Sequence, residues 1–314
     1  MTDELRDRYD VVVIGGGAAG LNGALMLGRA RRSVAVIDAG EPRNAPADGV
    51  HGLLGREGVP PGELLAAGRA EVRAYGGHVV EGRVAKALKR DREFVVALED
   101  GREVVARRLL VAAGVVDRLP EIPGLAERWG KDVVHCPYCH GWEHRDQAIG
   151  VIGSGPMSAH QALLFRQWTD DLVFFTHTAP ELSAEDREKF AARGIRVVEG
   201  RIAAIEADGA RMEDGRLVER RAFATATRME ARAGFLAGLG LEVAEHPSGA
   251  GEHVPADQFG KTAVPGVWAA GNVTDLMAQV GPAAVAGAMA GAMINADLIE
   301  AETAEAVEVH RLGA

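Results

Sequence analysis

The amino-acid sequence contains twice the unit of strand, glycine turn, helix and strand that is typical of nucleotide-binding domains. From Tyr9 the first copy runs through an apolar strand, a glycine turn, a helical segment and a second apolar strand. Gly15, Gly17 and Gly20 fit G-x-G-x-x-G, in which the glycines tighten the turn, admit a pyrophosphate and let helix and strand pack closely. Asp38 ends the second strand, where a carboxylate binds ribose hydroxyls. The complete unit predicts a nucleotide site, and the alternative is a glycine-rich turn without a ligand.

The second copy, residues 148–178, is altered in its ligand-binding positions. Gly153 and Gly155 hold the first two glycine positions, and Ser158 holds the small third position. The second strand ends in Thr176-His177-Thr178, which offers neither an acid for the NAD ribose nor an arginine pair for the NADP 2′-phosphate. We therefore expect an α/β protein with two Rossmann-like nucleotide-binding domains, the second inserted in the first. The second ligand site is either intact for nicotinamide nucleotides or, as we favour, vestigial.

Two further strands end on small residues. Residues 107–114 form an apolar stretch that closes on Gly114, and residues 262–272 form another that closes on a glycine and Asn272. A chain of small residues can pass close to a cofactor, and Asn272 could reach a cofactor hydroxyl or phosphate. The alternative for both segments is an ordinary strand-to-loop glycine.

Every cysteine of the chain lies in one C-x-x-C-H segment formed by Cys136, Cys139 and His140. Two thiols at this spacing can close a small disulfide ring and exchange readily, which predicts redox chemistry. The alternatives are covalent haem attachment, a zinc site that also uses His135, His140 or His144, and two buried cysteines without a redox role. Structural zinc usually needs a second cysteine knuckle, which the chain lacks, so we expect no metal.

Length and composition restrict the remaining classes of function. The chain has 314 residues, 47% of them hydrophobic, with 40 glycines, and carries a net charge of −10 without a block of basic residues. It is long enough for two domains, and nucleic acid is an unexpected partner. The apolar stretch Val280–Ile294 is too short to span a bilayer comfortably, so we expect a packed helix and no membrane association. The charged N-terminus lacks an apolar signal core, which favours the cytoplasm and a catalytic disulfide.

The motifs GGGAAG, CPYCH before GSGPMS, and VPGVWAAGN, taken in this order, resemble the bacterial thioredoxin reductase family of flavoproteins. The resemblance covers nearly the whole chain and implies FAD in a discontinuous domain of residues 1–120 and 245–314. It also implies an inserted NAD(P)-binding-like domain, residues 121–244, that carries the redox disulfide, and a homodimer. The residues that the resemblance assigns to the cofactor are Gly15, Gly17, Ala18, Ala19, Gly20, Asp38, Ala113, Gly114, Gly271, Asn272, Gln279 and Val280.

The chain departs from the family pattern at three places. NADPH-dependent members carry His-Arg-Arg where this chain has Thr176-His177-Thr178, and Arg-Gln where it has Gln279-Val280. The usual CxxC-Asp becomes Cys139-His140. This pattern is similar to a subgroup that works in the reverse direction as dithiol oxidases. Its members close disulfides in natural products such as gliotoxin and holomycin, and electrons pass to FAD and then to oxygen, with hydrogen peroxide formed.

By the convention of this family, Cys136 meets the substrate dithiol and Cys139 lies against the flavin. His140 is then the candidate base, because a neutral imidazole accepts thiol protons at neutral pH, although it can equally be a satisfied histidine at a helix start. Tyr138 and Trp142 either line a substrate face or pack in the core. The alternative functions are an NAD(P)H-dependent reductase of thioredoxin and a flavin-bound redox sensor.

Overall fold

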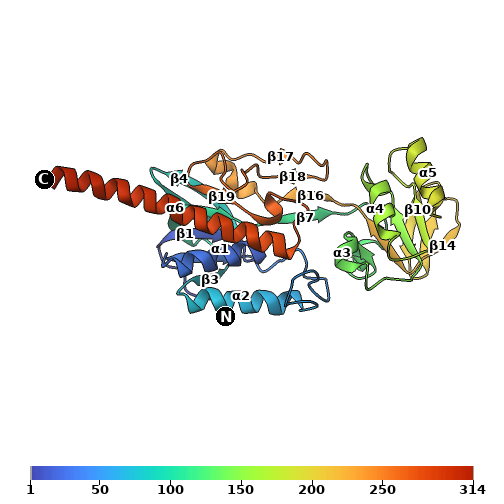
Figure 1. Cartoon of the computed structure of the whole chain (residues 1–314), viewed down its shortest axis with the longest axis horizontal. Coiled ribbons are helices and arrows are strands. Elements are labelled where there is room, and N and C mark those ends of the chain that lie inside the picture. Colours follow the sequence, from blue (N-terminus) through green and yellow to red (C-terminus); the bar gives the residue numbers. More distant parts are fainter. Residues whose placement is uncertain (1, 314) are drawn as a thin grey trace. The chain divides into compact units, whose positions relative to one another are not determined.

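The computed structural model describes residues 2–313 and divides into two compact units (Figure 1). The first contains Met1–Ala45, Pro60–Val116 and Met229–Ala314, and the second contains Pro46–Val59 and Asp117–Arg228. We expected domain boundaries near residues 120 and 245. The second unit instead ends at Arg228, where β16 (Arg228–Ala231) pairs with β7 (Val115–Arg118), and it also includes the loop Pro46–Val59.

A seven-stranded mixed sheet forms the centre of the first unit. The parallel strands lie in the order β3, β2, β1, β6, and β19 also pairs with β6 in parallel. On the other side of β6, β5 and then β4 continue the sheet as antiparallel strands. The bounds are β1 Arg8–Ile14, β2 Val34–Asp38, β3 His78–Glu81, β4 Val84–Arg90, β5 Glu93–Leu98, β6 Glu103–Val111 and β19 Val267–Ala269. A short pair, β17 (Ala244–Glu245) and β18 (Glu252–His253), completes the strands of this unit.

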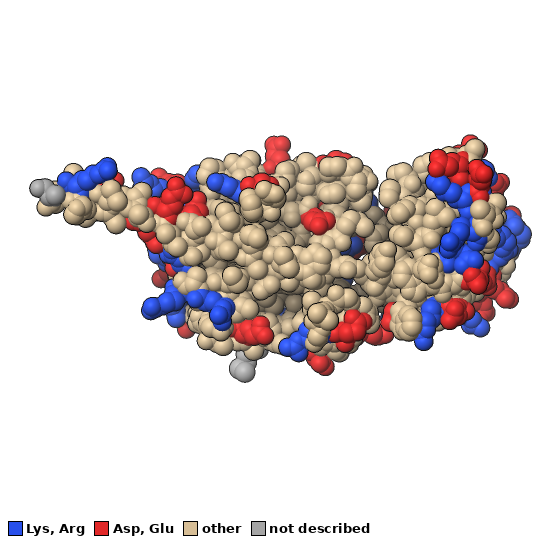
Figure 2. Space-filling view, in the orientation of Figure 1, with Lys and Arg blue, Asp and Glu red and all other residues tan. Residues whose placement is uncertain are grey.

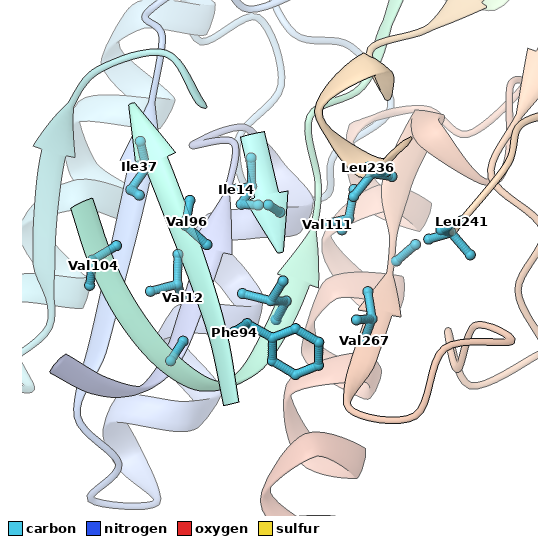
Figure 3. Packing of buried hydrophobic residues seen from close by; sticks show 14 of the residues in the cluster. Val12, Ile14, Ile37, Phe94, Val96, Val104, Val111, Leu236, Leu241 and Val267 are labelled. Atoms are coloured by element: carbon cyan, nitrogen blue, oxygen red, sulfur yellow. The ribbon is translucent and has the colours of Figure 1, made fainter. Parts of the chain in front are cut away.

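Both faces of this sheet are buried, which is typical of parallel strands covered on each side. Successive residues of β1 enter opposite cores, because side chains alternate along a strand. Val12 and Ile14 pack in one cluster with Phe94, whereas Val11 and Val13 pack in another. Figure 3 shows the first cluster, in which Phe94, Val96, Val104, Val111, Leu236, Leu241 and Val267 lie near Val12, Ile14 and Ile37.

The helices of the first unit are α1 (Ala18–Arg29), α2 (Pro61–Ala74) and α6 (Val280–Gly313). α6 packs against α1 with almost no side chain between the backbones, since a Cβ on Gly287 would lie 1.9 Å from the Ala19 oxygen. Within the described residues α6 has the length and composition of a membrane span, yet its first turns belong to the core. Figure 1 shows that its C-terminal part continues past the strands of this unit. The predicted packed helix is therefore present, and it is longer than residues 280–294.

A five-stranded parallel sheet in the order β11, β10, β9, β15, β8 forms the core of the second unit. The bounds are β8 Val133–Val134, β9 Ile149–Ile152, β10 Leu172–Phe175, β11 Arg196–Val198 and β15 Ala222–Thr225, with helices α3 Pro137–His140, α4 Ser158–Phe165 and α5 Ala184–Ala192. A three-stranded antiparallel sheet adds β12 Ile202–Glu206, β13 Gly209–Met212 and β14 Leu217–Glu219.

Three short 3₁₀ helices span Ala126–Arg128 in the second unit and Gly234–Leu239 and Gly271–Val273 in the first. The predicted α/β fold with two Rossmann-like units is confirmed.

Candidate functional site

The first glycine loop joins β1 to α1 in a turn that leaves no room for side chains at two positions. Gly15 has φ +107°, and a Cβ on it would lie 2.3 Å from the Ala112 oxygen. A Cβ on Gly20 would lie 1.8 Å from the Gly15 oxygen. The first and third glycines of the motif therefore let α1 begin directly against the end of β1, as a dinucleotide loop requires.

The middle of this loop is open and carries uncommitted donors. A Cβ on Gly17 would meet nothing within 4 Å. In the part of the chain that the structure describes, the backbone N–H groups from Gly17 to Gly20 donate to no protein acceptor. Such N–H groups at a helix start bind phosphate oxygens well, because the positive end of the helix dipole lies there as well.

Other residues predicted to bind the cofactor lie at the same edge of the sheet. β1, β2 and β6 are parallel neighbours, so the segments that follow their carboxyl ends meet there. Asp38 ends β2, and its Oδ1 accepts a hydrogen bond of 3.2 Å from the Gly40 N–H. Ala113 and Gly114 follow β6, and the Gly114 oxygen accepts from the Arg232 N–H at 3.0 Å.

The segment from Gly271 to Val280 connects β19 to α6 and touches the first loop. A Cβ on Gly271 would lie 2.8 Å from the Ala19 Cβ. The Asn272 Nδ2 donates to the oxygens of Asp275 at 3.0 Å and Ala278 at 2.8 Å, so this amide shapes the loop before α6. Within residues 2–313, the Asn272 side chain keeps its Oδ1 for a cofactor, a role that stays a prediction. Gln279 and Val280 open α6, where the Gln279 oxygen accepts from the Ala283 N–H at 2.9 Å.

The redox pair lies at the start of the short helix α3 in the second unit. Cys136 is the N-cap residue, and the Cys139 and His140 N–H groups both donate to its oxygen, at 3.3 and 3.2 Å. The two Sγ atoms lie 2.7 Å apart, and both side chains are half-buried. A disulfide needs a separation of about 2.05 Å, so the backbone of α3 already places the two sulfurs for closure.

His140 lies half-buried beside the pair, where it can act as a neutral base. Its Nδ1 is buried and has no hydrogen-bond partner among the described residues. Burial lowers the pKa of His140 below its usual value, and the neighbouring His144 and His51 lower it further, while Glu143 opposes them. The imidazole is therefore neutral and able to accept a proton at neutral pH.

The other two histidines of the segment are bonded to backbone. A ring nitrogen of His135 lies 3.1 Å from the Thr225 oxygen, and one of His144 lies 3.0 Å from the Lys131 oxygen. Across residues 2–313, no group of three His, Cys, Asp or Glu side chains is placed to hold a metal ion.

In the loop after β10, the polar side chains bond to the backbone of residues 200–202. The Thr176 Oγ1 accepts from the Gly200 N–H at 3.1 Å, and the His177 Nδ1 accepts from the Ile202 N–H at 3.1 Å. His177 holds φ +40°, and its pKa is lowered by burial and by Arg201. Both side chains thus stabilise the segment that leads into β12, and neither supplies the cation that a 2′-phosphate requires.

Comparison with known proteins agrees with this arrangement. The family model described as pyridine nucleotide-disulphide oxidoreductase matches residues 9–292. The chain belongs to this family. It is 32% identical to the thioredoxin reductase tcpT of Claviceps purpurea (strain 20.1), over 92% of this chain and 94% of that protein. Among solved structures it is similar to HlmI, with 42% identity, a TM-score of 0.91 and full coverage of both chains. It is also similar to the thioredoxin reductase TrxB of Bacillus anthracis, with 30% identity, a TM-score of 0.86 and coverage of 94% and 99%.

Members of this pyridine nucleotide-disulphide oxidoreductase family that resemble thioredoxin reductase are flavoproteins, and FAD is the cofactor of this chain. The first glycine loop fits the group on three observations. The space beside Gly17 admits a pyrophosphate, the N–H groups up to Gly20 are uncommitted, and the Asp38 carboxylate ends the neighbouring strand. The individual contacts of these residues with FAD stay predictions.

One feature of this family member was missed in the sequence. The loop Pro46–Val59 is closed by the Val50 N–H, which donates to the Val59 oxygen at 2.8 Å, and it carries a His51–Glu57 pair at 2.6 Å. His51 Nε2 also lies 3.6 Å from Glu143 Oε1, just after the redox pair. No local sequence pattern predicts the contact between His51 and Glu143, because the two residues are distant in sequence. Their proximity is a property of the fold.

The sequence left Tyr138 and Trp142 either on a substrate face or in the core, and the structure places both in an exposed aromatic rim beside the cysteines. Tyr138 and Trp142 are each 65% exposed, so neither packs in a core. Tyr138 contacts Trp168 edge-on at 5.7 Å between ring centroids, and the Arg145 guanidinium lies 4.2 Å from the Trp142 ring centroid. Aromatic side chains held on a surface in this way suit contact with an apolar ligand.

Proposed function

We propose that this chain is an FAD-dependent dithiol oxidase that closes an intramolecular disulfide in a small natural product, with oxygen as the final acceptor. The observation that carries the proposal is the loop after β10. Thr176 and His177 bond to the following segment, and neither side chain supplies a cation of the basic fork that binds NADPH. A chain with a redox pair but a weakened nicotinamide site is suited to take electrons from a dithiol.

The residues of α3 account for the exchange with the substrate. One substrate thiolate attacks the Cys136 sulfur of the Cys136–Cys139 disulfide, forms a mixed disulfide and releases Cys139 as a thiolate. The second substrate thiolate attacks the substrate sulfur of that mixed disulfide, so the product disulfide forms and Cys136 leaves as a thiolate. The substrate has then lost two electrons and two protons, and the cysteine pair has gained the electrons. Bound FAD supplies the two-electron acceptor that restores the pair and delivers the electrons to oxygen as hydrogen peroxide.

His140 supplies the base that makes the substrate thiolates. Burial keeps its imidazole neutral, so it accepts a proton where a carboxylate would be a weaker base. The imidazolium that results lies near Glu143, whose charge favours it. The exposed Tyr138 and Trp142 rings border the pair and give a small apolar dithiol a surface on which to bind.

A second candidate is an NAD(P)H-dependent thioredoxin reductase, which the names of the relatives favour. The relatives from Leptosphaeria maculans and Aspergillus oryzae, sirT and aclD, are each 30% identical and also carry that name. This candidate requires NADPH to reduce the flavin of this chain. In both candidates we propose that the chain acts as a cytoplasmic homodimer. Light scattering would measure the mass of this dimer.

The two candidates are separated with the FAD-loaded protein and a panel of small dithiols that includes dithiothreitol. The oxidase should consume oxygen and form one hydrogen peroxide for each disulfide closed, and the Cys136→Ser protein should not. Anaerobic NADPH should bleach the yellow flavin only slowly. Rapid bleaching by NADPH, together with no oxygen uptake from any dithiol, would reverse the assignment. Flavin binding without either activity would favour a redox sensor.

A further inference from the structure

The second glycine loop satisfies its own backbone donors with a side chain. The Ser158 Oγ accepts hydrogen bonds from the Ser154 N–H at 3.0 Å and from the Gly155 N–H at 3.1 Å. Ser158 is 0% exposed, so its hydroxyl lies inside the loop and away from solvent. Two donors of the loop are therefore committed to the protein.

The rest of the loop offers little to a phosphate. Pro156 has no N–H, and the Ser158 N–H donates to the Gly155 oxygen at 3.1 Å. From Ser154 to Ser158, as far as the structure describes their bonds, only the Met157 N–H has no acceptor in the protein. A pyrophosphate in a dinucleotide loop is bound mainly by such N–H groups.

The first loop of the same chain provides the comparison. The position that Ser158 occupies is Gly20 there, and no hydroxyl is present. The N–H groups of the first loop from Gly17 to Gly20 have no acceptor in the described protein. One fold thus holds two loops of the same pattern, one with open donors and one whose donors are capped.

The second glycine loop is also bonded to the end of β15. The Ser154 Oγ donates to the Ala226 oxygen at 3.0 Å and lies 3.3 Å from the Thr225 Oγ1, which ties the loop to the end of β15. The loop therefore cannot turn its donors outward without breaking side-chain bonds at both Ser154 and Ser158.

We propose that Ser158 is a specificity-determining residue whose hydroxyl occupies the place of a phosphate oxygen and closes the second loop to dinucleotides. The effect differs from that of the missing basic fork. A fork distinguishes NADP from NAD through the 2′-phosphate, whereas the capped donors act on the pyrophosphate that both share. Ser158 therefore excludes NADH as well as NADPH. The inference concerns binding alone and does not depend on the oxidase function.

The test measures binding of NADH and of ADP-ribose to the FAD-loaded protein by calorimetry. The wild type should show no binding of either at millimolar ligand. Ser158→Gly, which reproduces the first loop, should tighten the binding of both at least about tenfold, because freed donors then bond to a charged phosphate. Ser154→Ala is the matched control, since it removes a neighbouring hydroxyl but leaves Ser158 in place, and it should not gain binding. Pro156→Ala combined with Ser158→Gly should bind more tightly than Ser158→Gly alone.

Amide hydrogen exchange tests the same inference without a variant. In the wild type, the Ser154 and Gly155 N–H groups should be protected before any nucleotide is added, and added NADH should not change their exchange. Rapid exchange at both positions would overturn the proposal. So would micromolar binding of NADH to the wild type, or unchanged NADH affinity in a Ser158→Gly protein that keeps its FAD and its melting temperature. Absence of oxidase activity with every dithiol would instead count against the proposed function and leave this inference standing.

Discussion

His51 and Glu143 join two segments that are distant in sequence, with 3.6 Å between the His51 Nε2 and the Glu143 Oε1. The other ring nitrogen of His51 lies 2.6 Å from Glu57. The loop Pro46–Val59 therefore meets the segment that follows the redox pair, and the charges of His51 and Glu143 both act on His140. This contact predicts that the loop Pro46–Val59 changes the pKa of His140.

Replacing His51 by alanine should move the acidic limb of the pH profile of dithiol oxidation to higher pH. His51 lowers the pKa of His140, so its removal raises that pKa and keeps the imidazole protonated to a higher pH. The measurement is kcat/KM for oxygen uptake between pH 5.5 and about 9. His310→Ala, at an exposed site on α6, should leave the profile unchanged. A shift to lower pH in His51→Ala would contradict the prediction.

Removing the base itself should have a larger effect. His140→Ala should slow dithiol oxidation at pH 7 by about 10²- to 10⁴-fold, the usual contribution of a positioned base. The loss should shrink at alkaline pH, where substrate thiols ionise unaided. Oxygen uptake measured from pH 6 to 10 checks this. A loss of the same size at every pH would assign His140 a structural role.

The lowered pKa of His140 also predicts how stability depends on pH. Its pKa in the folded state lies below the unfolded value of about 6.5, so the unfolded chain binds more protons near pH 6 and unfolding becomes easier as the pH falls through that window. The melting temperature of the wild type should therefore drop between pH 7.5 and 5.5 more steeply than that of His140→Gln. Parallel curves for the two proteins would show that this histidine does not contribute.

The two cysteines should have different spectra when substituted. Cys136→Ser leaves the Cys139 thiolate, which should give a long-wavelength charge-transfer band with oxidised flavin if Cys139 is the flavin-facing sulfur. Cys139→Ser should lack the band. Absorption spectra recorded across pH 6 to 9 check this. Equal spectra in the two variants would contradict the assignment of roles.

The sequence was sufficient for the features that repeat or follow a local rule. Each glycine loop was predicted because a turn such as that at Gly15 has a strict steric requirement, and the structure places it where β1 meets α1. α6 was underestimated, since the apolar pattern fades after Ile294. Its continuation is held by ion pairs with distant residues, Arg108 with Asp297 at 2.5 Å and Arg32 with Glu302 at 2.6 Å. Such partners are not visible in a linear pattern.

The functional site shows the same division. Cys136 and Cys139 are close in sequence, and their spacing alone suggested a redox pair. The His51 contact and the Ser158 cap depend on how segments meet in three dimensions. Asn272 was predicted to face a cofactor, yet its amide bonds to the following loop because that loop turns back on it before α6. A polar side chain after a strand has local partners that only the folded chain shows.

Filling the space beside Gly17 should prevent FAD binding without preventing folding. A Cβ there meets no atom within 4 Å, so Gly17→Leu can fold, but the leucine occupies the room that a pyrophosphate needs. The purified variant should be colourless. Gly155→Leu is the matched control in the second loop, where a Cβ also meets nothing within 4 Å, and it should stay yellow. Stoichiometric FAD in Gly17→Leu would refute the assignment of this loop.

The direction of electron flow is decided by the relative reactivity of NADPH and dithiols. A basic fork would give charge-assisted bonds of about 1.5–3 kcal/mol each, and this chain has Thr176-His177-Thr178 in its place. Losing two such bonds weakens NADP binding by roughly two to four powers of ten, since each 1.4 kcal/mol is tenfold. Anaerobic NADPH should therefore reduce the flavin slowly, and thioredoxin turnover should stay slow, while a small dithiol in air yields hydrogen peroxide. Stopped-flow absorbance of the flavin and a peroxide assay measure the two rates. Fast NADPH-driven reduction of thioredoxin, with no peroxide from any dithiol, would establish the reductase instead.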